Sequence, residues 1–505
     1  MTKPKEQKQI GLLIRELREK KGMTQQDFAE ALATSQSAVA RMETGGQNFT
    51  LDQLSKISDV LGHKVIKLPD SSIDFQIEGG HTLSGSIQTN TSKNGALGLL
   101  CASLINQGKT TLHGIPRIEE VYRYIEIMQS IGIKVTWTDT KTIEIIVPEK
   151  INIDAIDTKV ATKTRSFTFV GGLIHHMKNF SFPHSGGCKM GERTIASNKF
   201  GLETLGVKIK TKEHNYEITV PKNLARNKTI VMYESSDTGT IAMLLASARI
   251  PAITTIKFAP PNYQVQDVCF FLEKLGVKIE GIGTTTLIVH GKETIRENVE
   301  HENSEDPIES MFFITAGIVT KSKLTITRCP IDFLELEMEK LTHMGLKFNM
   351  SKSYLSKNMR TRLVDITVMP SKLKAPHDKI HTQPFPGLQN DNLPFFVSIA
   401  VQAEGTTLIH DWTWENRAIY FTELNRLGAD VKLLDQHRAL VTGPSKLKAA
   451  QIICPPALRP SATIFLSMLA AEGTSMLRNI YAIARGYEEI AERLNSIGAK
   501  IKVLQ

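Results

Sequence analysis

A cysteine placed between two cations is the first feature of this sequence that could carry chemistry. Cys188 follows Gly186 and Gly187 and is flanked by Lys189 and Arg193. The glycines allow backbone conformations that a Cβ atom would exclude, and nearby positive charge favours the thiolate form of a cysteine. The pattern indicates an activated thiol on a loop, suited to chemistry on a small anion. An incidental cysteine on a surface loop fits the same residues.

The remaining composition sets the context for that thiol. Cys101 and Cys269 lie within apolar runs, which predicts that they belong to the core. Five cysteines without metal-type spacing fit a reducing compartment, and we expect neither a metal nor a cofactor. No apolar run approaches membrane-spanning length, so we expect a cytoplasmic protein without membrane contact. The net charge is +9, most of it after residue 70, as expected for a protein that binds anionic substrates.

The first 66 residues have the pattern of a small helical module. Apolar residues recur at helical spacing from Ile10 to Leu17, and Gly22 ends that helix. Thr24 and Ser35 are predicted caps of a second and a third helix, and Thr50 with Gln53 predicts a capping box for a fourth. A helix, a tight turn and a short polar-faced helix are typical of the helix-turn-helix.

Residues 23–43 of this module resemble the phage-repressor-like helix-turn-helix family. The resemblance implies that Gln36, Ser37 and Arg41 face the major groove of double-stranded DNA, and that Gln25 and Ser35 contact phosphates. One copy binds DNA weakly, so a homodimer on a two-fold site is the natural expectation. A helical bundle that has lost DNA binding and only mediates dimerisation is the alternative.

A repeat organises the rest of the chain. A glycine follows an amphipathic helix and precedes a short β-branched strand six times, at Gly132, Gly206, Gly276, Gly345, Gly428 and Gly498. Helices that alternate with such strands predict a mixed α/β unit. Six units are too many for one core of ordinary size, so we expect three units in each of two lobes. A ligand would then bind in the cleft between the lobes.

Residues 73–505 resemble the enolpyruvyl transferases, and within them the UDP-N-acetylglucosamine enolpyruvyl transferases of peptidoglycan synthesis. The segments that carry the resemblance run through residues 92–97, 163–166, 186–193, 306–309, 415–417, 458–462 and 484–488. The implied fold is an inverted α/β barrel of two lobes, following an all-α helix-turn-helix domain. The expected boundaries are 1–66 for the helix-turn-helix, 67–72 for a linker, 93–303 for the lobe with Cys188, and 73–92 with 304–505 for the second lobe.

The resemblance also implies roles for individual residues. Phosphoenolpyruvate carries a phosphate and a carboxylate, so its site must present several cations. Lys93, Arg193, Arg459 and Arg485 match those positions, with Arg165 beside them, and Asn94 and Arg417 match further substrate-binding positions. Lys93 and Arg485 also match catalytic positions. Cys188 matches the residue that donates a proton to C3, forms a covalent adduct with the substrate, and is alkylated by fosfomycin in the family.

A base must take the proton of the acceptor hydroxyl. The family pattern has an aspartate after a Phe-Pro stretch, and here Asp391 follows Phe385-Pro386 a few residues later than the pattern has it. Asp391 is therefore our candidate base, and Asp306 is a weaker one.

Three segments depart from the family pattern around the acceptor. Residues 194–198 lack the usual proline, acid and histidine, residues 235–239 match the nucleotide segment only loosely, and Asn262-Tyr-Gln264 replaces acidic residues. We therefore expect enolpyruvyl transfer from phosphoenolpyruvate to UDP-N-acetylglucosamine or a related UDP-sugar or nucleotide, with a fused DNA-binding module. One alternative is a transcription regulator whose transferase-like region senses a ligand with little turnover. Another is transfer to a different nucleotide in secondary metabolism.

Overall fold

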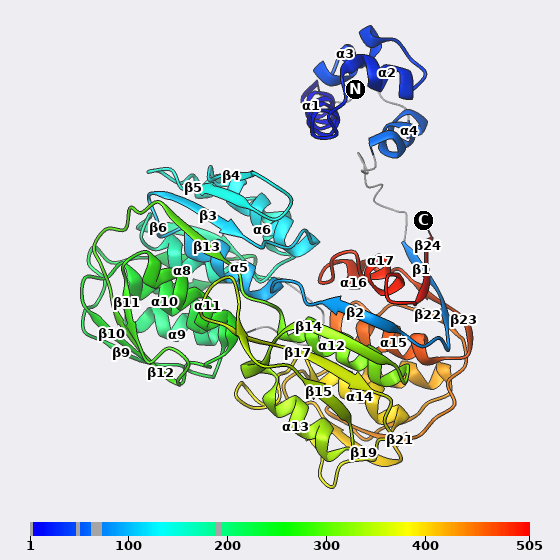
Figure 1. Ribbon diagram of the computed structural model, residues 1–505. Coiled ribbons are helices and arrows are strands. Elements are labelled where there is room, and N and C mark those ends of the chain that lie inside the picture. Colours follow the sequence, from blue (N-terminus) through cyan, green and yellow to red (C-terminus); the bar gives the residue numbers. More distant parts are fainter. Residues whose placement is uncertain (1–3, 47–50, 62–72, 187–193, 505) are drawn as a thin grey trace. The chain divides into compact units, whose positions relative to one another are not determined.

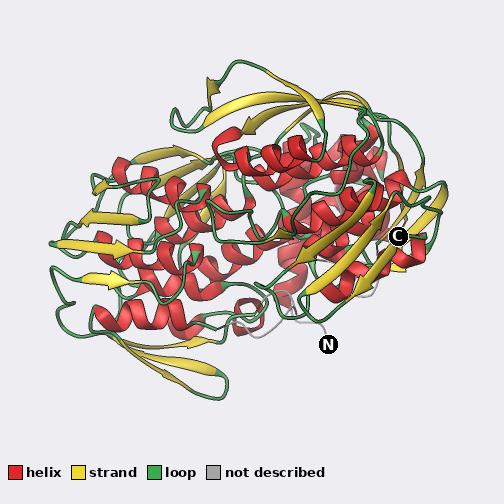
Figure 2. Ribbon diagram, turned by 90° about the horizontal axis from the view of Figure 1, so that it is seen from below, coloured by secondary structure: helices red, strands yellow, loops and turns green. Residues whose placement is uncertain are grey.

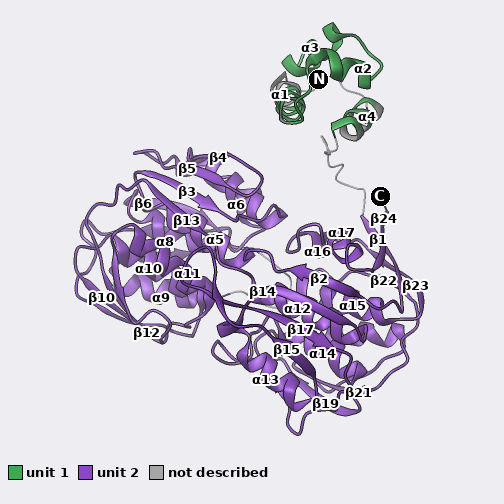
Figure 3. Cartoon of the chain, viewed as in Figure 1, with its two compact units in different colours: residues 1–72, 505 green, residues 73–504 purple. Residues whose placement is uncertain are grey.

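The computed structural model describes residues 4–46, 51–61, 73–186 and 194–504, which fall into two compact units (Figure 3). The first unit ends at Ser72 and the second runs from Ile73 to Leu504. Within the described ranges, no helix has the length and apolar content needed to cross a membrane.

The first unit is a bundle of four helices around a small core. The helices are α1 (Pro4–Lys20), α2 (Gln25–Ala31), α3 (Gln36–Thr44) and α4 (Leu51–Leu61). The predicted caps are confirmed: Thr24 and Asp27 form a capping box on α2, and the Ser35 side chain accepts from the backbone N–H of Ala38 at the start of α3. Thr50, the other predicted cap, lies outside the described residues.

The second unit contains the six predicted repeats. Six sheets lie in the described part of this unit, one for each repeat. Each of the six glycines has a φ angle between 79° and 103°, the left-handed conformation that only glycine adopts without strain, between a helix and the strand that follows it. Five of these helices are α-helices, and the one before Gly428 is a 3-10 helix.

The first three repeats build one lobe. Its sheets have the strand orders β13-β3-β5-β4, β6-β8-β7 and β11-β12-β10-β9. The strands are β3 (Lys109–His113), β4 (Lys134–Trp137), β5 (Ile143–Ile146), β6 (Asn179–Pro183), β7 (Lys208–Thr211), β8 (Asn215–Thr219), β9 (Thr229–Val231), β10 (Ile253–Lys257), β11 (Lys278–Glu280), β12 (Thr286–His290) and β13 (Val299–Glu302). The helices are α5 (Lys93–Ser103), α6 (Glu119–Ser130), η1 (Ile153–Ala155), α7 (Thr158–Ala161), η2 (Ser166–Phe169), α8 (Val170–Leu173), α9 (Ala196–Thr204), α10 (Asp237–Ala248) and α11 (Tyr263–Lys274).

The other three repeats build the second lobe, which also includes the first two strands of the unit. Its sheets have the strand orders β15-β17-β14-β2, β18-β19-β21-β20 and β22-β23-β1-β24, with β16 paired to β17. The strands are β1 (Asp74–Gly79), β2 (Ser84–Gln88), β14 (Lys323–Pro330), β15 (Lys347–Met350), β16 (Tyr354–Leu355), β17 (Arg362–Met369), β18 (Ile380–His381), β19 (Gly405–His410), β20 (Asp430–Leu433), β21 (Arg438–Gly443), β22 (Gln451–Ile453), β23 (Gly473–Arg478) and β24 (Lys500–Leu504). The helices are α12 (Pro307–Val319), η3 (Ile331–Phe333), α13 (Glu335–His343), α14 (Leu393–Gln402), η4 (Ala418–Leu427), α15 (Leu458–Ala470), α16 (Tyr481–Ala484) and α17 (Ile490–Asn495).

Helices fill the interior of each lobe and strands cover the outside (Figures 1 and 2). The helices α5 and α10 in the first lobe, and α12, α14 and α15 in the second, are buried along almost their whole length. Their sequences are apolar on all sides, which is what a fully enclosed helix requires. One hydrophobic core spans Ala96 to Val299, and the other joins Phe75–Ile87 to Ile308–Ile501.

The chain crosses between the lobes twice, and the two crossings touch. The strand β2 pairs in parallel with β14, and residues 89–92 then lead into α5 of the first lobe. On the return path Thr91 pairs with Glu305, and the Asn303 Nδ2 atom donates to the Ser92 carbonyl oxygen at 2.8 Å. The start of α5 is therefore fixed at the boundary between the lobes.

Candidate active site

Three of the predicted cations lie around one buried carboxylate, that of Glu120. The Lys93 Nζ atom, at the start of α5, lies 2.8 Å from Glu120 Oε2 on α6. The other oxygen of Glu120 lies 3.8 Å from Arg165 Nε and 4.0 Å from Arg485 Nη2. Arg485 belongs to the second lobe and the other two cations to the first, so this cluster spans both lobes.

The electrostatics of the cluster follow from its burial. Although burial opposes ionisation, the charges of Lys93, Arg165 and Arg485 lower the pKa of Glu120 to about 2. Burial also lowers the pKa of Lys93, and the charge of Glu120 acts against that shift. Glu120 is therefore a fixed negative charge that balances the cations around it.

Arg459 forms a second cationic position, in the second lobe. It lies in the first turn of α15 and is 5% exposed. Its Nη2 atom is 2.9 Å from Asp391 Oδ2, and its Nη1 atom donates to the Tyr487 hydroxyl at 2.9 Å. Burial opposes the ionisation of Asp391, but the charges of Arg459 and Lys93 hold the pKa of that carboxyl well below its usual range. The candidate base is therefore ionised and held in place by one of the predicted cations.

A hydrogen-bonded chain positions Arg165 and Asn94 on the first lobe. Arg165 Nη2 donates to Asn94 Oδ1 at 3.0 Å, and Asn94 Nδ2 donates to the Tyr263 hydroxyl at 3.0 Å. The Tyr124 hydroxyl donates to the Arg165 carbonyl oxygen at 2.8 Å. Arg165 and Asn94 are thereby fixed from three different helices.

A large cleft lies beside these groups, and Asn94, Arg165, Tyr263 and Asp391 are the ones that line it. Its volume is about 1510 Å³, including space open to solvent, and residues of both lobes line it. The first lobe contributes Asn94, Arg165, Asn198, Asp237 and Asn262, and the second contributes Ile308, Gln389, Asn390 and Asp391. The predicted position of a ligand, between the two lobes, agrees with this cleft.

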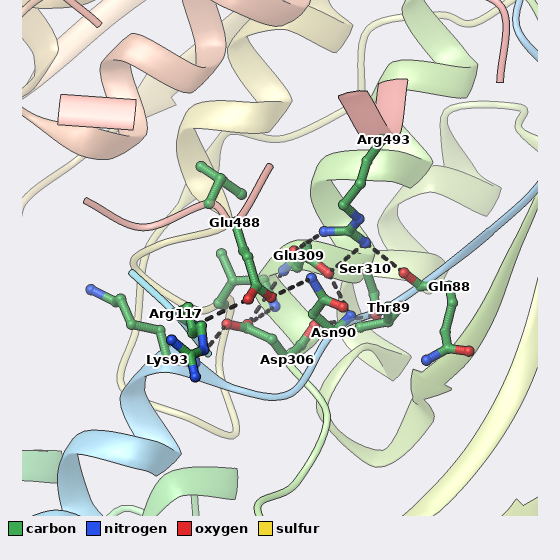
Figure 4. Close-up of polar contacts among 12 residues, drawn as sticks. Gln88, Thr89, Asn90, Lys93, Arg117, Asp306, Glu309, Ser310, Glu488 and Arg493 are labelled. Atoms are coloured by element: carbon green, nitrogen blue, oxygen red, sulfur yellow. Dashed lines mark hydrogen bonds and ion pairs between the residues drawn. The ribbon is translucent and has the colours of Figure 1, made fainter. Parts of the chain in front are cut away.

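Polar contacts beside the cluster connect the lobe crossing to the C-terminal segment (Figure 4). Glu488 Oε1 accepts from the backbone N–H of Arg117 at 3.2 Å, and its other oxygen lies 2.8 Å from Lys141 Nζ. Arg493 Nη1 lies 2.6 Å from Glu309 Oε1. Arg485 and Tyr487 are in the same second-lobe segment as Glu488. The contacts of Glu488 therefore hold this segment against the first lobe.

Two predicted residues, Arg417 and Asp306, are absent from the described cleft lining, as are Lys93, Arg459 and Arg485 of the adjoining cationic positions. Arg417 is fully buried and makes a two-pronged ion pair with Asp411, so the structure does not bring it to the cleft lining. Asp306 caps α12, where its Oδ1 atom accepts from the backbone N–H groups of Ile308 and Glu309. The cap accounts for Asp306 without a role as a base.

The predicted Cys188, Lys189 and Arg193 lie outside the described residues. The four other cysteines are free and buried, and the predicted core positions of Cys101 and Cys269 are confirmed. Burial raises the pKa of the Cys329 thiol to about 12 and that of Cys454 to about 11. It also raises the pKa of Cys101 and of Cys269. None of these four described thiols is suited to nucleophilic or acid–base chemistry near neutral pH.

The three segments that depart from the family pattern come together on the first-lobe wall of the cleft. Asn198, Asp237 and Asn262 each line it. The Asn262 Nδ2 atom donates to Asp237 Oδ2 at 3.1 Å, and the helices α9 and α10 pack against each other. The departures therefore form one surface and are not scattered changes.

In the first unit, the predicted DNA-contact residues lie at the start of α2 and along α3 with its cap. Ser35, Gln36, Ser37 and Arg41 are exposed. Gln25 is half-buried and donates to Glu43 Oε2 at 2.9 Å, and the Gln36 amide donates to the Gln25 side chain at 3.4 Å. The Ser35 hydroxyl is occupied as the cap of α3.

Sequence reasoning missed Glu120, Tyr263 and Tyr487. Glu120 follows another glutamate in an amphipathic helix, a position that reads as a solvent-facing residue. Tyr487 lies within the segment 484–488, and its hydrogen bond to Arg459 joins residues 28 positions apart. No local pattern signals such contacts.

Comparisons with known proteins match both units of the chain. The model of the family described as EPSP synthase (3-phosphoshikimate 1-carboxyvinyltransferase) matches residues 77–494, and a helix-turn-helix family matches residues 14–64. The chain is 33% identical to the UDP-N-acetylglucosamine 1-carboxyvinyltransferase of Bradyrhizobium diazoefficiens over 85% of this chain and 98% of the relative. It is 29% identical to the enzyme of the same name from Treponema denticola over 85% and 99%.

Solved structures show the same fold. The enolpyruvyl transferase NikO from Streptomyces tendae superposes with a TM-score of 0.72 at 22% identity, over 86% of this chain and 99% of that one. EPSP synthase from Acinetobacter baumannii gives a TM-score of 0.66 at 17% identity, over 86% and 100%. The predicted fold, a two-lobed α/β enolpyruvyl transferase preceded by a helix-turn-helix domain, is confirmed.

Proposed function

The chain belongs to the EPSP synthase family, and on that basis we propose that residues 73–505 transfer the enolpyruvyl group of phosphoenolpyruvate to a hydroxyl of UDP-N-acetylglucosamine or a related UDP-sugar or nucleotide. The observation that carries the proposal is the cationic cluster beside the cleft, of which Arg165 lines the cleft itself. Lys93, Arg165 and Arg485 surround Glu120, and Arg459 is paired with Asp391. Several cations at one site suit a substrate that carries both a phosphate and a carboxylate.

The reaction is an addition followed by an elimination. The acceptor oxygen bonds to C2 of phosphoenolpyruvate while C3 takes a proton, and Asp391 accepts the proton of the acceptor hydroxyl. Phosphate then leaves from C2 with the electrons of its bond, and C3 loses a proton as the double bond forms again. Lys93, Arg459 and Arg485 stabilise the charge on the phosphate and carboxylate groups. Cys188, by its match to the family, donates the proton to C3.

The acceptor is proposed from the relatives. The curated relatives that match over 85% of this chain are named for transfer to UDP-N-acetylglucosamine. Such an enzyme would serve peptidoglycan synthesis in the cytoplasm. The departures at Asn198, Asp237 and Asn262 are the reason for including related UDP-sugars and nucleotides.

Phosphate release from phosphoenolpyruvate tests the proposal. We would assay the purified chain with UDP-N-acetylglucosamine, other UDP-sugars and UMP, and expect release with at least one of them. Tight binding of an acceptor without any phosphate release would instead support a regulator that senses the ligand.

We also propose that the first unit binds double-stranded DNA as a dimer. Exposed Gln36, Ser37 and Arg41 on α3 support this, because amide, hydroxyl and guanidinium groups hydrogen-bond to base edges in the major groove. Gln25 and Ser35 lie beside them and are proposed to contact phosphates.

Selection of bound sequences from a random DNA pool, followed by fluorescence anisotropy, tests the DNA proposal. Arg41→Ala is expected to weaken binding to the selected site by about 1–3 kcal/mol if it reads a base. Lys56→Ala, the matching loss of one charge at an exposed position of α4, serves as the control. A pool without enrichment, together with a dimeric protein, would favour a module that only mediates dimerisation.

A further inference from the structure

The first-lobe wall of the cleft has hydrogen-bonding atoms that the protein itself leaves unused. Asp237 begins α10, after the capping residue Ser236. Its Oδ2 atom accepts from Asn262, whereas its buried Oδ1 atom has no hydrogen-bond partner among the described residues. The amide nitrogen of Asn198, which is 7% exposed, also has no partner in the described part of the chain. Buried polar atoms usually have partners, so these two point to a missing one.

The two unused atoms belong to neighbouring helices. A Cβ atom added to Gly239 would lie 2.5 Å from the Ser197 hydroxyl oxygen, which shows how closely the starts of α9 and α10 approach. Asn198 follows Ser197, Asp237 precedes Gly239 by two residues, and both side chains line the cleft. A group bound against this wall therefore lies beside both residues.

The charges on this wall restrict that group further. Among the described residues that line the cleft, the charged ones are Arg165, Glu234, Asp237 and Asp391. Arg165 is already engaged by Asn94 and Glu120, and the other three are acidic. A phosphate placed against Asp237 would meet a like charge, which costs free energy.

We propose that Asp237 is a specificity-determining residue for the acceptor, which accepts a hydrogen bond from an uncharged hydroxyl or N–H group while Asn198 donates to an adjacent oxygen. The phosphate groups of the acceptor then lie elsewhere in the cleft. This inference rests on the proposed transferase function and specifies how its acceptor is selected.

The ionisation of Asp237 supplies an independent readout. Burial raises the pKa of Asp237 to about 6, and the charge of Asp391 acts in the same direction. The side chains of Asn262 and Gln264 and the charge of Arg165 oppose the shift. As the pH falls through 6 the carboxylate takes up a proton and ceases to be a charged acceptor, so acceptor affinity falls.

Asp237→Asn tests the proposal, because the substituted side chain keeps an oxygen for Asn262. The probes are UDP-N-acetylglucosamine and UMP, measured by phosphate release and by calorimetric binding without turnover. The acceptor KM and Kd are expected to rise about tenfold, the loss of one hydrogen bond to a charged group. The KM for phosphoenolpyruvate should change less than twofold, and the loss of acceptor affinity below pH 6 should disappear.

Asp154→Asn, the same change at an exposed position of this lobe that does not line the cleft, is the matched control. Asp237→Glu keeps the charge and should bind more tightly than Asp237→Asn. Turnover with an unchanged acceptor KM and Kd in Asp237→Asn would overturn this inference and leave the transferase function intact. If acceptor binding depends on Asp237 but no phosphate is released, this inference stands and the transferase function is overturned. If the unaltered protein binds neither probe, both the inference and the transferase function are overturned.

Discussion

Glu120 Oε2 lies 2.8 Å from Lys93 Nζ, and both side chains are more than nine-tenths buried. The same carboxylate is 4.0 Å from Arg485 of the other lobe. The cationic cluster thus contains its own counter-charge, which makes it compatible with burial.

Replacement of Glu120 should destabilise the protein, because it removes this counter-charge. Glu120→Gln removes the carboxylate that pairs with buried Lys93, so we expect the free energy of unfolding to fall by about 3–5 kcal/mol, measured by urea denaturation. Inorganic phosphate should restore more stability to this variant than to the unaltered protein, because it can replace the lost charge. Glu126→Gln, on the same helix but 45% exposed, should cost less than about 1 kcal/mol. Equal losses in the two variants would contradict a counter-ion role for Glu120.

The lowered pKa of Lys93 predicts that phosphoenolpyruvate binds more weakly at alkaline pH. Burial moves the pKa of this lysine below its ordinary 10.5, and the charged form predominates only at pH values below the pKa. The KM for phosphoenolpyruvate should therefore rise as the pH increases toward 10. Lys93→Arg, which keeps its charge at all these pH values, should show a flat profile over the same range. A rise in KM of equal size in both proteins would mean that another group causes the pH dependence.

Asp391 is expected to act on the chemical step and not on the binding of phosphoenolpyruvate. Asp391→Asn should lower kcat at least about 100-fold, the usual contribution of a general base. Because Arg459 holds the pKa of Asp391 well below its usual range, activity should not decline through protonation of this residue between pH 5 and 7. Steady-state kinetics across that range measure both effects. A decrease in kcat of less than tenfold would remove Asp391 as the base.

Fosfomycin should label one cysteine. Burial raises the pKa of all four described thiols, to about 11 for Cys454 and about 12 for Cys329, so these remain protonated at neutral pH. We expect a single adduct at Cys188 by peptide mass mapping and none in Cys188→Ala. Cys454→Ser should still be labelled. Absence of an adduct at Cys188 would argue against an activated thiol there.

The sequence alone determined the repeated framework of this protein. Each of the six glycines, such as Gly132, ends a helix in the left-handed conformation before a strand. The caps at Thr24 and Ser35 formed where the sequence placed them. Turn and cap preferences act over a few residues of chain, so they are visible in the sequence itself. The resemblance to a family added Lys93, Arg165, Arg459 and Asp391, which the structure brings to one cleft and its adjoining cluster.

Only the tertiary structure decided how those charges are balanced and which of them reach the cleft. Glu120 and Lys93 are 27 residues apart in the chain, and Arg485 reaches Glu120 only because the two lobes meet there. Asp411 pairs with the guanidinium of Arg417 in a buried ion pair, and Arg417 is absent from the described cleft lining. Which charges meet depends on how buried helices pack and on the free energy of leaving an ion unpaired. Those interactions join distant parts of the chain and leave no local pattern in the sequence.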